Sequence, residues 1–168
     1  MASLHTCTVQ ELKETLTQAE VSALPRAVLG VAPNGEGRTL TQEQQEQVDA
    51  WLEDKLTQAA DNVVSAVNAC EQNARIAFGA LKVPEALAYT ALVLARHAVI
   101  SAIPGQAETL EGSTRAAEYN TATATLARVA SCELYVNDYA DDEEDPDIVS
   151  RGGAVALVNN EEAMPWRF

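Results

Sequence analysis

The side chains that most often perform catalysis are scarce in this sequence. His5 and His97 are its only histidines, so a histidine base or a multi-histidine metal centre has little to draw on. His97 follows Arg96 inside an apolar stretch, which favours a core or interface histidine over a catalytic base. The chain also lacks a Walker-type phosphate loop and a GxSxG nucleophile elbow. These observations predict that the protein is not an enzyme and binds no cofactor.

Carboxylates are plentiful, and two groups of them could in principle bind a metal ion. The run from Asp141 to Asp145 offers oxygen ligands to calcium, but it lacks the D-x-[DN]-x-[DN]-G spacing and the distant bidentate glutamate. We therefore interpret it as a solvated linker. The second group could line a helical bundle, but it forms no Glu-x-x-His pair of the di-iron type, so we expect a solvated face. Its members are Glu43, Glu46, Glu71, Glu118 and Glu133.

The cysteines and the hydropathy of the chain indicate in which cellular compartment the protein is expected. Cys7, Cys70 and Cys132 are an odd number and lie far apart, so the spacing predicts neither a disulfide framework nor a zinc site. The first residues lack a basic leader followed by an apolar run, so no signal peptide is expected. The most apolar window, Leu87 to Ile103, is interrupted by Arg96-His97 and is interpreted as a buried helix. We expect a soluble, intracellular protein without membrane contact.

Helical patterns fill most of the first 137 residues. Capping boxes at Thr8 to Glu11 and Thr41 to Gln44 each precede apolar residues at helical spacing. A further short helix is expected over Ala19 to Leu29, interrupted or initiated near Pro25. The pattern after Thr41 predicts a long amphipathic helix.

Later signals predict where this long helix ends and two others begin. The pattern has a potential break near Asp61-Asn62 and runs down at Gly79. A helix from Pro84 to Ile103, apolar on nearly all sides, is predicted at the centre of the bundle. The last helix should begin after Ser113 as N-cap and extend to about Leu134.

Composition supports an all-α fold. Hydrophobic residues make up 47% of the chain and aromatic residues only 5%, and the apolar content is largely Ala, Val and Leu, which favours closely packed helices. We predict a helical bundle with long amphipathic helices and an extended C-terminal arm. The predicted domains are a helical body over residues 1–137 and an acidic hinge with a docking arm over residues 138–168.

The C-terminal segment is predicted to hold a partner. Seven carboxylates and no base lie between Asp138 and Asp147, half of the net charge of −14, so this hinge should be extended and solvated. The segment Ile148 to Phe168 is neutral and ends in a Trp-Arg-aromatic cluster typical of binding hot spots. The alternative is a frayed terminus. The candidate partner-binding residues are Val155, Leu157, Met164, Pro165, Trp166, Arg167 and Phe168.

The body is acidic too, with no basic stripe that could neutralise phosphates, so sequence-specific binding to DNA or RNA is not expected. An acidic surface would suit a wall past which DNA slides without sticking. Plain solubility accounts for the same charge.

Four pieces of sequence between Leu40 and Val136 form a recognisable pattern. They are a helix around Val48 to Leu56, Val83-Pro84-Glu85-Ala86-Leu87, Leu94-Ala95-Arg96-His97, and Arg115-Ala116-Ala117-Glu118-Tyr119 leading into Thr125-Leu126-Ala127-Arg128-Val129-Ala130. Taken together, these pieces resemble the head-tail connector (adaptor) proteins of tailed bacteriophages and prophages. The resemblance covers somewhat more than half of the chain. Some members carry a glycine soon after the last helix, where this chain has Ser131-Cys132-Glu133.

The resemblance implies a structural protein that forms a ring of about twelve copies below the portal through head-to-tail contacts. Such a ring extends the DNA channel and receives a neck or tail-completion protein, and arms such as Ile148 to Phe168 reach the portal. The protein would lie in the virion neck, and in the host cytoplasm during assembly. The alternative is a small acidic helical regulatory or protein-binding module.

Overall fold

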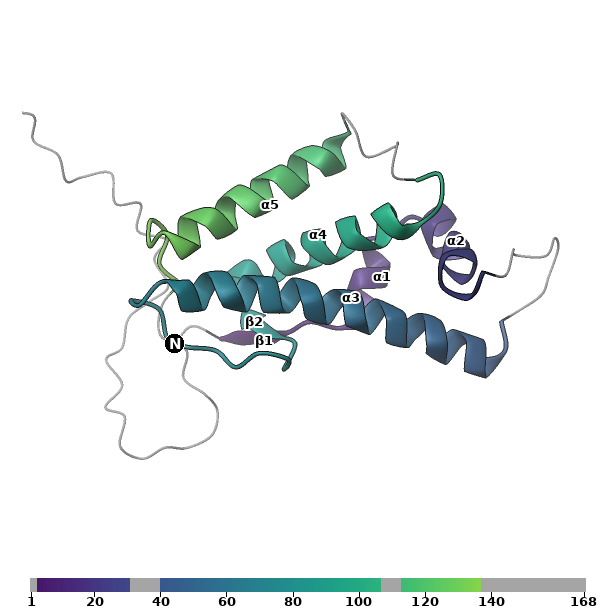
Figure 1. The fold of residues 1–168 in the computed structure, drawn as a ribbon, viewed down its shortest axis with the longest axis horizontal. Helices are drawn as coiled ribbons and strands as arrows, with labels where there is room; N and C mark the ends of the chain where they lie inside the picture. Colours follow the sequence, from purple (N-terminus) through teal and green to yellow (C-terminus); the bar gives the residue numbers. More distant parts are fainter. Residues whose placement is uncertain (1–2, 31–39, 107–112, 137–168) are drawn as a thin grey trace, which may run out of the picture.

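The computed structural model of this protein describes residues 3–30, 40–106 and 113–136. Within these ranges it forms a helical bundle with one small two-stranded sheet (Figure 1), which confirms the all-α prediction for the body. The elements, in chain order, are β1 (Leu4–Thr6), α1 (Val9–Glu14), α2 (Gln18–Leu29), α3 (Gln42–Ala69), β2 (Lys82–Pro84), α4 (Glu85–Ala102) and α5 (Thr114–Ala130). The acidic hinge and the arm, residues 138–168, lie outside the described residues.

Three helices form the main layer of the bundle. α4 runs antiparallel to α3 and α5, and the three contact one another (Figure 1). α4 also contacts α1 and both strands, which confirms its predicted central position. α3 places one apolar face against these neighbours, and its buried side chains recur at helical spacing. They are Val48, Leu52, Leu56, Ala59, Ala60, Val63, Val64 and Val67.

Side-chain caps begin four of the five helices in the described ranges. Both predicted capping boxes are present, at Thr8 before α1 and at Thr41 before α3. A third box, between Thr17 and Glu20, begins α2 and was not predicted. Pro25 neither begins nor interrupts α2 but lies inside it. Ser113 caps α5 as predicted, since its side chain accepts from the Ala116 N–H.

Three helix boundaries differ from the sequence prediction. α3 is unbroken at Asp61 and ends at Ala69, ten residues before Gly79. It ends early because the Asn68 side chain donates to the Ile76 carbonyl and accepts from the Ile76 N–H, both at 2.9 Å, which turns the chain back across the helix end. Pro84 is the N-cap of α4 rather than its first helical residue.

α5 ends at Ala130 instead of near Leu134 because the chain enters a left-handed turn. Cys132 has a φ of 61°. Its N–H donates to the Val129 carbonyl, and the Glu133 N–H donates to the Arg128 carbonyl. These two bonds form a Schellman motif, which satisfies the last carbonyls of the helix and stops it.

The small sheet ties the first residues to the start of α4. β1 pairs antiparallel with β2, with His5 opposite Val83. The Cys7 N–H extends the pairing by donating to the Leu81 carbonyl at 3.0 Å. The sequence did not predict this sheet, because three-residue strands are too short to show an alternating pattern.

The prediction of no disulfide framework is wrong for one pair. Cys70, directly after α3, is bonded to Cys132, two residues after the end of α5, with 5.3 Å between their Cα atoms. Sequence spacing did not reveal this because the two cysteines are 62 positions apart, and only the packing of α3 against α5 brings the helix ends together. Cys7 is a free, buried thiol.

We predict that Leu56→Ala lowers the free energy of unfolding by about 2–5 kcal/mol, because it leaves a cavity at a side chain with no exposed surface. Urea unfolding followed by circular dichroism measures the change. Glu53→Ala on the exposed side of α3 is the matched control and should change the value little. Equal losses in both variants would contradict the assignment of the α3 core face.

Candidate functional site

The predicted partner-binding residues all lie outside the described residues: Val155, Leu157, Met164, Pro165, Trp166, Arg167 and Phe168. Their role stays a sequence-based prediction. The structure describes the body that carries them, up to Val136. The candidate site is therefore the part of the body that fixes α5 and the chain that follows it.

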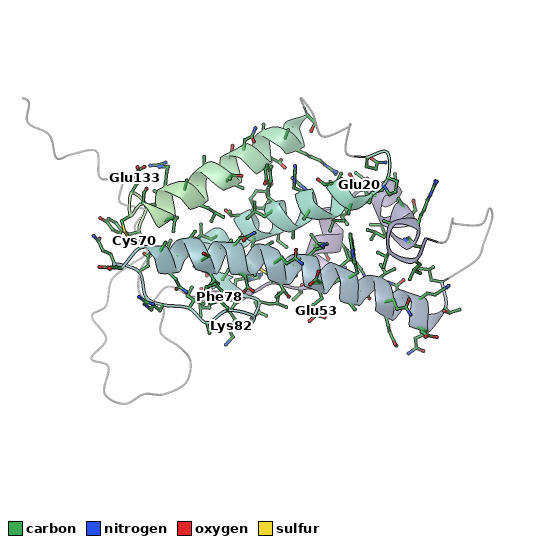
Figure 2. The ribbon with its side chains drawn as sticks, viewed as in Figure 1. Glu20, Glu53, Cys70, Phe78, Lys82 and Glu133 are labelled. Atoms are coloured by element: carbon green, nitrogen blue, oxygen red, sulfur yellow. A yellow bond between two sulfur atoms is a disulfide. The ribbon has the colours of Figure 1, made fainter. Side chains whose placement is uncertain are left out.

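The described chain ends in a contact that we call the C-terminal anchor, formed by Cys70, Asn73, Cys132 and Val136. The Val136 N–H donates to Asn73 Oδ1 at 2.9 Å, and the Asn73 amide donates to the Val67 carbonyl at 3.2 Å. Asn73 is only 6% exposed, so its polar atoms need these partners. The anchor holds Val136, the last described residue, at the end of the bundle where Figure 2 shows Cys70 and Glu133.

The other end of α5 is held by what we call the polar α5 interface, which comprises two ion pairs and a ring stack. Arg96 of α4 pairs with Glu118 of α5, and Arg115 of α5 pairs with Glu20 of α2. Arg96 and Glu20 are 9% and 5% exposed, and charges buried to this extent are tolerated only when they are paired. Glu118, which was expected on a solvated face, is half-buried and paired with Arg96, and the other four glutamates of that group are exposed.

Glu20 has two structural roles at once. Its carboxylate accepts from the Thr17 N–H at 2.7 Å as part of the capping box, and it also pairs with Arg115. Burial alone would raise the pKa of Glu20, but the hydrogen bonds from Arg115 and Thr17 outweigh it and lower the pKa. The stabilisation that Glu20 contributes is therefore present at neutral pH and is lost in acid, as the pH falls through its lowered pKa.

His97 of α4 stacks on Tyr119 of α5 within the same interface. The ring centroids are 3.8 Å apart and the planes differ by 19°. Burial and the neighbouring Arg96 charge lower the pKa of His97, so its imidazole is neutral at physiological pH. This confirms the interpretation of His97 as an interface histidine.

α5 contributes few side chains to the apolar core, with Leu126 packed against it while partly buried. Only Ala122 and Val129 of this helix are buried. Eight of its residues are exposed, and only Arg128 among them is charged. Thr121, Thr123 and Thr125 donate their hydroxyls to carbonyls one turn earlier in α5, so no hydroxyl proton of these three is left for a partner. The outer face of α5 is thus a nearly uncharged surface of small side chains.

The exposed surface of α3 has a different character. The exposed charged residues of α3 are all acidic: Glu43, Glu46, Glu53 and Asp54. Elsewhere, Phe78 and Tyr89 are each 60% exposed. The body therefore presents an acidic helix, a nearly uncharged helix and two exposed aromatic rings.

The described residues contain neither a metal-binding cluster nor a membrane-spanning helix. Within residues 3–30, 40–106 and 113–136, no three His, Cys, Asp or Glu side chains are grouped so as to hold a metal ion. No helix in the part of the chain that the structure describes is long and apolar enough to cross a bilayer. The acidic run Asp141 to Asp145 lies outside these ranges.

Comparisons of this chain with protein-family models, curated proteins and solved structures found no match.

The polar α5 interface should make stability depend on pH. The pKa of His97 is lowered in the folded protein, whereas in the unfolded chain it is near 6.5. The unfolded chain therefore takes up a proton first, and stability falls as the pH drops below about 6.5. We expect His97→Gln to make the melting temperature depend less on pH between pH 7 and pH 5, measured in thermal scans followed by circular dichroism.

Tyr119→Phe is the control for this prediction, because it keeps an aromatic ring against His97. Its melting temperature should retain the pH dependence of the unmodified protein. If His97→Gln and the unmodified protein respond identically to acid, the imidazole is not the titrating group.

Proposed function

We propose that this protein is a structural head-tail connector (adaptor) of a tailed bacteriophage or prophage. In this proposal it forms a ring below the portal, extends the DNA channel and joins the head to the neck or tail. Its partners are the portal protein, a neck or tail-completion protein and further copies of itself. The protein acts by assembly and carries out no catalysis. The protein would be in the host cytoplasm during assembly and in the virion neck afterwards.

The observation that carries the proposal is that the pieces of sequence resembling connectors form one packed unit. Two of them contain the side chains that join α4 to α5: Leu94 to His97 meets Arg115 to Tyr119 through the Arg96–Glu118 pair and the His97–Tyr119 stack. The other pieces lie on α3, across β2 and the start of α4, and in the second half of α5. The residues that carry the resemblance thus also make tertiary contacts of the body. A chance match in helix spacing would not require the matching residues to contact one another.

The surface chemistry is compatible with a closed ring. A head-to-tail ring needs two different faces on each copy that contact each other. Copies with a net charge of −14 repel one another, so contact between them favours a face with little charge, such as that of α5. Acidic side chains such as those exposed on α3 repel phosphates and would let DNA pass without being bound.

The arm extends the proposal to the portal. The C-terminal anchor fixes where the chain leaves the body, and ten extended hinge residues can span about 30 Å. Trp166 and Phe168 would then bind the portal, and the charge between Asp138 and Asp147 would keep the arm away from DNA.

The decisive experiment mixes the full chain with the portal protein of the same phage and images the product by negative-stain electron microscopy and mass photometry. A closed ring attached to the portal is expected. A chain that stays monomeric at high concentration with portal present would show that the connector proposal is wrong.

Deleting Met164 to Phe168 should leave the helical circular-dichroism signal intact and weaken binding to the portal, because the deletion removes the aromatic cluster of the arm. Trp166→Ala alone should weaken binding by about 2 kcal/mol, measured by biolayer interferometry. Glu161→Ala in the same arm is the matched control. A truncated chain that binds the portal normally would overturn the role of the arm.

A second candidate function is a small acidic regulatory or protein-binding module. Phe78 and Tyr89, each 60% exposed, favour it because exposed aromatic rings are common at protein contacts. Such a module would bind one partner in a small complex of fixed stoichiometry. Double substitution Phe78→Ser and Tyr89→Ser should then abolish partner binding, whereas a connector would still form rings.

A further inference from the structure

The disulfide joins two helix ends that are distant in sequence. Cys70 follows α3 and Cys132 follows α5, and their Cα separation of 5.3 Å is in the usual range for a disulfide. Figure 2 shows Cys70 and Glu133 at the same end of the bundle, opposite the end where Glu20 lies. The bond therefore closes a covalent loop that includes β2, α4 and α5.

Cys132 occupies a position that the backbone would give to glycine. Its φ of 61° lies in the left-handed region, at the residue that ends α5 in the Schellman motif. A side chain at this position strains the backbone, so a cysteine here is unfavourable for the turn itself. The stabilisation from the bond to Cys70 offsets that strain, which accounts for a cysteine at this position.

The two cysteines differ in their access to solvent. Cys70 is only 1% exposed, whereas Cys132 is partly exposed. In thiol–disulfide exchange, a thiolate attacks one sulfur and the other leaves as a thiolate. Attack from solvent therefore falls on Cys132, and Cys70 is the leaving group.

We propose that Cys70 and Cys132 form a redox-operated lock that exchanges with low-molecular-weight thiols at Cys132. To open, a thiol such as glutathione bonds to the Cys132 sulfur and releases the Cys70 thiolate, which takes a proton. A second glutathione then attacks the mixed disulfide, leaving two protein thiols and one glutathione disulfide. Closing is the reverse: two electrons and two protons pass from the protein to glutathione disulfide.

The closed lock holds the chain that leads out of α5. The Asn73 N–H donates to the Cys70 carbonyl at 3.1 Å, and Asn73 Oδ1 accepts from the Val136 N–H. The residues from Cys132 to Val136 are thus held by a covalent bond at one end and by Asn73 at the other. When the disulfide is reduced, the hydrogen bond from the Val136 N–H to Asn73 is the remaining directional contact that the structure describes between the end of α3 and residues 132–136.

The third cysteine is an internal reference for this chemistry. Cys7 is buried. Its burial is the main cause that raises its pKa to about 11, and the nearby Glu11 charge is the second cause. The thiolate is the reactive form, so the Cys7 thiol should react slowly with alkylating reagents at neutral pH. A redox response that is confined to Cys70 and Cys132 can therefore be distinguished from general thiol chemistry.

The test uses the full chain, treated with dithiothreitol or with glutathione disulfide, then with iodoacetamide under native conditions, and analysed by intact and peptide mass spectrometry. The oxidised protein should take up no rapid label. The reduced protein should be labelled first at Cys132. The oxidised protein should also melt on the order of 10 °C higher, because the bond closes a loop spanning 62 positions.

Three variants separate the lock from its backbone effects. Cys70→Ser should remove the redox response of the melting temperature. Cys132→Ala and Cys132→Gly should remove it equally, but the glycine variant should melt higher than the alanine variant because glycine adopts the left-handed turn without strain. Equal melting temperatures for the oxidised and reduced protein, or labelling of Cys7 as fast as Cys132, would overturn the lock.

The bearing of the lock on assembly rests on the proposed connector function. A reducing cytoplasm would keep it open while rings form, and an oxidising exterior would close it in the released particle. Oxidised chains should then dissociate from the portal at least several-fold more slowly than reduced ones, whereas the two forms of Cys70→Ser should dissociate alike. Loss of this difference with an intact melting response counts against the connector function, and loss of the melting response counts against the lock.

Discussion

The position of α5 depends on directional contacts in addition to a narrow apolar seam. Ala122 and Val129 are its only buried residues, and Leu126 packs against the core while partly buried. Two ion pairs, one ring stack and one disulfide provide most of the specific contacts. Such contacts add less stability than apolar packing, but they define one register, since removing a partner leaves a buried charge uncompensated. The body therefore gains a uniquely placed helix whose attachment responds to the chemistry of its surroundings.

The same contacts connect the two ends of the chain. Glu20 lies on α2 and pairs with Arg115, 95 residues later, while it also caps its own helix. The N-terminal helices are thereby tied to the start of α5, and the disulfide ties the end of α5 to the end of α3. α5 is fixed at one end by charge and at the other by a covalent bond. The chain that follows it begins from a defined point, which any docking function of the C-terminal residues requires.

Local signals in the sequence predicted the helices but could not predict these connections. Capping boxes at Thr8 and Thr41 and apolar spacing depend on neighbouring residues, so the elements they predicted are present. The Cys70–Cys132 bond, the Glu118 ion pair and the β1–β2 pairing depend on residues far apart in the chain, and nothing in their local sequence indicates the partner. A left-handed turn occupied by cysteine, as at Cys132, suggests a bonded thiol, but the local sequence does not reveal that turn. The predicted arm residues lie outside the described ranges, so their role still depends on composition.

The ion pairs of α5 also determine the charge of its surface. The helix has three charged residues, and each has an opposite partner: Arg115 with Glu20, Glu118 with Arg96, and Arg128 with Glu133. The two inner pairs hold the helix, and all three pairs leave its surface with little net charge. In a chain with a net charge of −14, such a face repels other acidic surfaces least. Breaking one of the inner pairs would loosen the helix and leave one of its charges unpaired.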